Sequence, residues 1–271
     1  MTFIVILIAL VVERFFDWGH LRKWEWFTHY QQAVVKRFPS QQPFVVLALT
    51  IVPILVLVFL LGVLLESPLF GFVEFLFQLF LFLYCLGPQN LWADIYSCIN
   101  ALAHGDQQAA TAKLKNSFGV TETSQLLKNI FIAANRRVFA VVFWYLVLGP
   151  VGAVLYRTIT LSAGEFSQQD TVPELIPSAR SVESVLDWIP VRIFTCVFAL
   201  GGHFVQVISC WRKKPVFSLD VNEKLLTDCG AAALGTDQDA ADGSAERSAV
   251  GLLDRAFVIT LVIVAIFVML F

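Results

Sequence analysis

The chain has 271 residues, of which 58% are hydrophobic and only 15% are charged. Because soluble domains carry roughly 25% charged residues, this composition predicts an integral membrane protein, and apolar runs of spanning length predict an all-α one. The formal net charge of −2 argues against a nucleic-acid-binding protein, which would carry a basic surface. The five cysteines show no metal-ligand spacing, so we read them as packing residues and expect no metal or cofactor.

The first segment, residues 2–16, is a short apolar helix that ends near Glu13 and Arg14. No basic residue precedes it, so we interpret it as an uncleaved membrane helix and not as a signal peptide. Charged residues at membrane depth usually pair with other groups. Glu13 and Arg14 are therefore either a charge pair at the headgroups or part of a ligand or proton site. Residues 17–42 follow as a polar connection whose three tryptophans suit a helix at the membrane interface.

Residues 43–65 and 69–87 are the next two predicted spans, and the short turn between them requires an antiparallel pair. Glu74 and Gln78 lie four residues apart, hence on one face of their helix. We interpret them as a polar pair that packs helices together; a substrate site is the alternative.

Residues 88–138 are predicted to form a cytoplasmic helical hairpin, with a break at Gly119 and a second helix that leads into the membrane. The next segment is Phe139–Ile159, an apolar run that Gly149-Pro150 interrupts. We expect the rest of the chain to pack around this broken helix. A break inside a spanning helix frees backbone groups, so we expect protein or a cavity around it.

The fifth candidate, residues 187–208, contains Arg192, Gly201-Gly202 and His203, and it either spans or is re-entrant. Residues 215–251 lack periodicity and are predicted to be a flexible cytoplasmic linker. A last span at residues 252–271 completes a single membrane domain, residues 1–271, of about six helices.

Counting Lys and Arg gives the topology. Five such residues occur in each of the segments 13–42, 88–138 and 209–252, whereas the turn 65–68 has none and residues 157–186 have two. Six crossings place the three basic segments together in the cytoplasm and both termini outside.

Several short motifs stand out along the chain: Val12-Glu13-Arg14-Phe15, Asn135-Arg136-Arg137-Val138-Phe139, Gly149-Pro150-Val151-Gly152-Ala153, Tyr156-Arg157, Leu186-Asp187-Trp188-Ile189-Pro190-Val191-Arg192 and Ala199-Leu200-Gly201-Gly202-His203. In combination, these motifs resemble the AmpE family of Gram-negative inner-membrane proteins. The resemblance implies a role in β-lactamase induction and in signalling linked to cell-wall recycling.

The chain also resembles, more distantly, the CobD/CbiB membrane enzymes of cobalamin synthesis, which join two substrates with ATP. The acidic pair of those enzymes corresponds here to Glu183 and Ser184, so one carboxylate is missing. Since such a reaction needs acidic residues to hold Mg²⁺, we interpret the chain as a scaffold that kept a polar membrane cavity and lost the ligase chemistry.

We therefore hypothesise a non-enzymatic membrane protein that binds an anionic metabolite, such as a muropeptide, or a partner, which includes a second copy of the chain. Arginines suit such a ligand because they meet carboxylates and phosphates in bidentate geometry. The candidate ligand-binding residues are Glu13, Arg14, Arg136, Arg137, Asp187, Arg192 and His203. Within this set we favour Arg136, Arg137 and Arg192 in mutual pairing with Asp187 or Glu13.

Three alternatives stay open. Arg136 and Arg137 can be interfacial anchors in the lipid bilayer. A residual ligase would use Asp94, His104 and Asp106, and a transporter would use the broken helix and the intramembrane charges.

Overall fold

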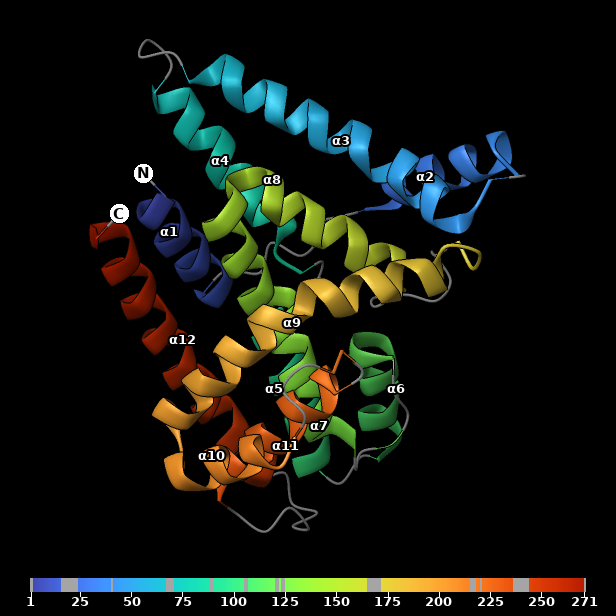
Figure 1. The fold of residues 1–271 in the computed structure, drawn as a ribbon. Coiled ribbons are helices and arrows are strands. Elements are labelled where there is room, and N and C mark those ends of the chain that lie inside the picture. The colour runs from blue at the N-terminus through green and yellow to red at the C-terminus, as the bar shows by residue number, and fades with distance from the viewer. Residues whose placement is uncertain are drawn as a thin grey trace. The chain divides into compact units, whose positions relative to one another are not determined.

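A computed structural model describes residues 2–15, 24–39, 41–66, 71–87, 90–104, 107–119, 122, 125–164, 172–214, 218–219, 221–235 and 244–270. The described residues form helices and the turns between them, and they contain no strand. The prediction of an all-α protein is confirmed. Figure 1 shows these helices, which fall into two compact units: unit 1 is Met1–Asn90 with Ala140–Leu186, and unit 2 is Leu91–Phe139 with Asp187–Phe271.

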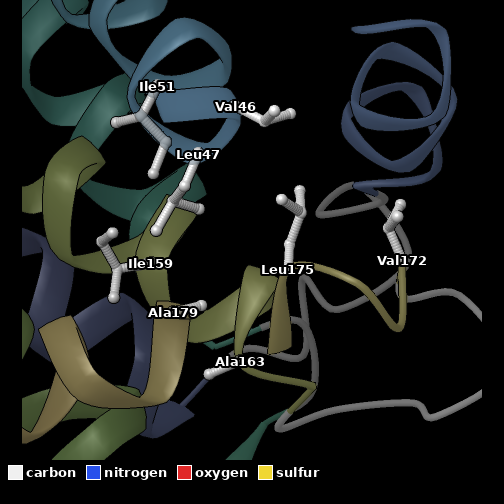
Figure 2. Close-up of a cluster of buried hydrophobic side chains, with 8 residues drawn as sticks. All are labelled: Val46, Leu47, Ile51, Ile159, Ala163, Val172, Leu175 and Ala179. Carbon is white, nitrogen blue, oxygen red and sulfur yellow. The ribbon is translucent and has the colours of Figure 1, made fainter. Parts of the chain in front are cut away.

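Unit 1 is built around the broken helix that the sequence analysis singles out. Its helices are α1 (Thr2–Phe15), α2 (Glu25–Arg37), α3 (Pro43–Leu65), α4 (Gly71–Cys85), α8 (Ala140–Ser162) and the first part of α9 (Ile176–Gly201). Helix α8 packs against α1, α3 and α4, and α2 packs against α3. Figure 2 shows one apolar cluster of this unit, to which α3 contributes Val46, Leu47 and Ile51 and α8 contributes Ile159.

The predicted break in α8 is confirmed at Gly149, whose φ of 63° and ψ of −151° are not helical. Only glycine adopts this conformation without strain, because a Cβ atom would clash with the backbone. Pro150 follows, and it has no N–H group to continue the helix ladder. Beyond the break, Gly152 approaches the carbonyl oxygen of Trp144 so closely that a Cβ atom would overlap with it.

Unit 2 contains the predicted hairpin and the C-terminal part of the chain. Its elements are α5 (Leu91–Ala103), α6 (Gln107–Phe118), α7 (Leu126–Ala134), a π-helix (Asn135–Phe139), the second part of α9, α10 (Phe204–Arg212), α11 (Asn222–Leu234) and α12 (Ser244–Leu270). In place of the first long helix of the hairpin the structure has two helices, α5 and α6, which pack against each other. Asp106 lies outside the described residues.

Two C-terminal segments differ from the sequence interpretation. Part of the predicted linker 215–251 is helical, since α11 buries Leu225, Leu226, Cys229 and Ala233, which recur every three or four residues. The predicted segment 187–208 is divided, because α9 begins earlier and ends at Gly201, and His203 precedes α10.

Four helices of the described chain are long and apolar enough to cross a membrane, at Pro43–Leu65, Leu126–Ser162, Ile176–Gly201 and Ser244–Ile266. Helix α4 is a shorter apolar helix of 15 residues. The chain is thus a membrane protein, and six crossings stay a prediction.

Candidate functional site

A cluster of polar side chains in unit 2 includes residues of the π-helix Asn135–Phe139, which directly follows α7. A π-helix admits an extra residue per turn and is frequent at functional sites. This one carries three consecutive polar side chains, of which Asn135 and Arg136 contact Asp187 and Arg137 contacts Asp94.

Arg136 lies between two carboxylates. Its Nη2 atom donates to Oε1 of Glu223 on α11 at 3.0 Å, and its Nε atom is 3.8 Å from Oδ2 of Asp187 on α9. The Asp187 side chain is only 8% exposed, whereas that of Glu223 is 62% exposed. One partner of Arg136 is thus fixed in the protein interior and the other faces solvent.

Asn135 supports the same carboxylate. Its Nδ2 atom donates to Oδ1 of Asp187 at 3.2 Å, and the side chain is almost completely buried. The Oδ1 atom of Asn135 has no hydrogen-bond partner among the described residues. A buried amide oxygen of this kind is costly unless something donates to it.

Arg192 is held beside this group by α9 and α11. Its Nη1 atom donates to the carbonyl oxygen of Trp188 at 2.7 Å and to Oδ1 of Asn222 at 3.1 Å. Its guanidinium carbon also stacks over the Trp188 ring, 4.3 Å from the centroid. Since Asn222 and Glu223 are adjacent, the first turn of α11 contacts both arginines.

We call this group the arginine cluster. It consists of Asn135, Arg136, Asp187, Arg192, Asn222 and Glu223. The cluster presents guanidinium groups beside carboxylates and amides, which is a donor set suited to an anion with several oxygen atoms.

Arg137 lies apart from the arginine cluster, although the sequence analysis groups it with Arg136. It is buried, donates to Oδ2 of Asp94 on α5 at 2.7 Å and to the carbonyl oxygen of Ser117 on α6, and lies over the Phe118 ring. Adjacent residues of a helix point in different directions, so the two arginines cannot share one partner easily. Asp94, a candidate acid of the ligase hypothesis, forms an ion pair here.

The remaining predicted site residues have surroundings of their own. Glu13 and Arg14 belong to α1 of unit 1, where Glu13 is buried and its carbonyl oxygen accepts from Nδ2 of Asn90 at 2.6 Å. His203 is exposed, and its backbone N–H donates to the carbonyl oxygen of Ala233 at 3.0 Å. His104 is also exposed, with Nδ1 2.7 Å from the carbonyl oxygen of Asn100.

Arg157, also noted in the sequence, is fully buried in unit 1. Its Nε atom donates to the carbonyl oxygen of Cys85 at 2.6 Å, and Nη1 is 3.5 Å from Oγ1 of Thr160.

Two members of the arginine cluster, Asn222 and Glu223, are not predicted as site residues from the sequence, because they lie in the predicted linker. The signal that could find them is the apolar spacing of Leu225, Leu226 and Cys229, which follows an acidic first turn.

The fold and the cluster define an all-helical membrane protein with a charged, partly exposed site in unit 2. Comparison with known families makes this more specific: the family model "Regulatory signalling modulator protein AmpE" matches residues 1–270. The chain belongs to the AmpE family, which links it to β-lactamase induction.

One individual relative carries the same family name, and two others are cobalamin biosynthesis proteins. Protein AmpE of Shigella flexneri is 28% identical over 225 residues, which is 78% of each chain. The cobalamin biosynthesis protein CobD of Chromobacterium violaceum is 28% identical over 161 residues, or 55% of this chain and 51% of that protein. CobD of Stutzerimonas stutzeri is 30% identical over 114 residues, or 42% and 36%.

The matches to the CobD proteins therefore span about half of their length or less. No solved structure matches the chain.

Proposed function

We propose that this AmpE-family protein resides in the bacterial inner membrane and reports an anionic cell-wall metabolite, with muropeptides as the candidate class. The ligand carboxylate binds Arg136 in the arginine cluster and takes the place of Glu223.

The observation that carries this proposal is the unequal pair of carboxylates around Arg136. A solvent-exposed ion pair such as Arg136–Glu223 contributes only about 0–1 kcal/mol, so a competing carboxylate displaces Glu223 at little cost. Asp187 stays in place because it is buried and hydrogen-bonded to Asn135. The exchange thus releases the first turn of α11, which gives binding a structural consequence.

Neighbouring groups add to the affinity for an anion. The Arg192 guanidinium is fixed by stacking on Trp188 and by hydrogen bonds to neutral acceptors, so its position is prepared in advance. Prepositioned arginines lose less rotamer entropy when they bind.

The test is calorimetric titration of the full chain in lipid nanodiscs with a muropeptide that has free carboxylates. We expect Arg136→Gln to weaken binding by about tenfold or more, because a charge-assisted bidentate contact is lost. Glu223→Gln should strengthen it by about two- to fivefold, because the competing carboxylate is removed. Lys128→Gln is the matched control, since it removes one positive charge from an exposed position of α7.

Two results would overturn the proposal. One is equal affinity of Arg136→Gln and Lys128→Gln. The other is undiminished binding of the same muropeptide after its carboxyl groups have been amidated.

The CobD relatives support a second candidate, a residual ATP-dependent amide ligase. This function predicts ATP turnover by the purified protein with Mg²⁺, a corrinoid acid and an amine, and loss of that turnover in Asp94→Asn. Phosphate release at the level of a protein-free blank excludes it.

A further inference from the structure

Helices α10 and α11 pack against each other in unit 2 (Figure 1), and two polar contacts join them. At one end the backbone N–H of His203 donates to the carbonyl oxygen of Ala233 at 3.0 Å. At the other end Nζ of Lys214 lies 2.6 Å from Oδ2 of Asp228. The start of α10 thus meets the end of α11, and the residues just after α10 meet the middle of α11.

Between these contacts the two helices bring two cysteines together. Cys229 on α11 is buried and Cys210 on α10 is partly exposed. Burial raises the pKa of the Cys229 thiol, and a hydrogen bond with the Cys210 thiol raises this pKa further. The two sulfur atoms are therefore neighbours in the folded protein.

A cation lies next to this thiol pair. The hydrogen bond to Asp228 raises the pKa of Lys214, and the electrostatic influence of both thiols raises it in the same direction. Lys214 lowers the pKa of the Cys229 thiol, although burial, Cys210 and Asp228 together raise it. Nearby positive charge favours the thiolate form of a cysteine.

We propose that Cys210 and Cys229 form a thiol-modification site that closes to an intramolecular disulfide by exchange with a low-molecular-weight disulfide such as glutathione disulfide. The bond ties α10 covalently to α11, the helix that carries Asn222 and Glu223. The thiol chemistry does not depend on the proposed function of the arginine cluster.

The order of the two steps follows from exposure. Cys210, the accessible thiol, loses its proton to solvent, and its thiolate attacks one sulfur of glutathione disulfide. A Cys210–glutathione disulfide forms and one glutathione thiolate leaves. Cys229 then loses its proton, attacks the Cys210 sulfur and releases the second glutathione thiolate. Two cysteine thiols are oxidised and one glutathione disulfide is reduced to two glutathione molecules.

The test uses the full-length protein in nanodiscs, exposed to glutathione buffers from fully reduced to fully oxidised, quenched with acid and mapped by alkylation and peptide mass spectrometry. We expect a peptide cross-linked through Cys210 and Cys229 in oxidising buffer and its loss in reducing buffer. In Cys229→Ser, glutathione should stay attached to Cys210, whereas in Cys210→Ser the buried Cys229 should react at least about tenfold more slowly.

Lys214 provides a kinetic control with a matched partner. Lys214→Met should slow disulfide formation by roughly threefold or more, because the thiolate loses its neighbouring cation. Lys213→Met, which removes an equal charge from the adjacent exposed position, should leave the rate unchanged. Three outcomes overturn the proposal: glutathione that remains on Cys210 of the unsubstituted protein, a cross-link of Cys229 to another cysteine, or no reaction at either thiol.

Discussion

Arg137 and Asp94 form a largely buried ion pair in unit 2. The two charged groups are 2.7 Å apart, and their side chains are 4% and 17% exposed. Removal of one partner of a buried ion pair leaves an uncompensated charge, whereas replacement of both by apolar residues is often tolerated. The pair therefore supports a stability role for Arg137, separate from the ligand-binding role that we propose for Arg136.

We predict that Arg137→Met destabilises the protein by about 3 kcal/mol or more. The double variant Arg137→Met/Asp94→Leu should recover much of this loss. The measurement is the free energy of unfolding in mixed micelles, with Lys128→Met as an exposed control. Equal stability of Arg137→Met and Lys128→Met would show that the ion pair contributes nothing.

Gly149 supplies a second prediction at the scale of one residue. Its φ of 63° and ψ of −151° lie in a region that essentially only glycine occupies, so we predict that Gly149→Ala is unfavourable by about 1–3 kcal/mol. Gly62 in α3 is the matched control, because a Cβ atom there meets nothing within 4 Å, and Gly62→Ala should be neutral or stabilising by up to about 1 kcal/mol. Similar unfolding midpoints for the two variants would contradict a structural requirement for glycine at the break.

The sequence predicts some of these residue positions well and others poorly. It groups Arg136 with Asp187, and the structure places their charged groups 3.8 Å apart. Arg137 contacts Asp94, which lies on another helix, 43 residues earlier in the chain, and the sequence does not indicate this pairing. Composition and spacing describe which residues need partners, but only the tertiary packing selects the partner.

At the scale of elements, α11 is the main difference between sequence and structure. Its helix is rich in small residues, and one of them, Gly230, lets α11 approach α7 closely. A Cβ atom at Gly230 would lie 2.7 Å from the Phe131 ring. In a sequence, a run of such small residues indicates a linker. In helical membrane proteins, however, small residues allow helices to pack closely.

We therefore predict that Gly230→Ala destabilises α11 by about 1–3 kcal/mol through overpacking against Phe131. Gly251→Ala in α12 is the control, since its added methyl group meets no atom within 4 Å. Hydrogen exchange measured by mass spectrometry should show faster exchange across residues 222–234 in Gly230→Ala only. Unchanged protection of α11 would mean that the close approach to α7 is not what holds this helix.

At the scale of the molecule, each unit joins segments that are far apart in sequence. In unit 1, Nε2 of Gln31 donates to Oγ of Ser162 at 2.6 Å across 131 positions. In unit 2, Nε1 of Trp92 donates to Oδ1 of Asp254 at 2.9 Å across 162 positions. Local periodicity identifies the helices, but it contains no information about such pairings.

The number of crossings depends on two short helices, α1 with 14 residues and α4 with 15, and the side of residues 88–138 depends on α4. At 15 residues it is only about 22 Å long, shorter than a bilayer core of roughly 30 Å. Without a crossing at α4, residues 88–138 would follow α3 on the same side as the turn at 65–68. That turn has no Lys or Arg, whereas residues 88–138 have five.

The positive-inside rule places the turn and residues 88–138 on opposite sides of the membrane, so we expect α4 to cross. The difference between the length of α4 and the bilayer thickness is modest, and local thinning of the bilayer relieves it at a fraction of a kcal/mol per Å. A fluorescent-protein fusion after Phe118 should fluoresce, and an alkaline phosphatase fusion there should be inactive. After Glu66, the alkaline phosphatase fusion should be active and the fluorescent-protein fusion should not fluoresce. Active phosphatase after Phe118 would remove α4 from the crossings and place α5 and α6 in the periplasm. Asn135 and Arg136 of the arginine cluster belong to the segment 88–138, so that result would move these two residues to the periplasmic side as well.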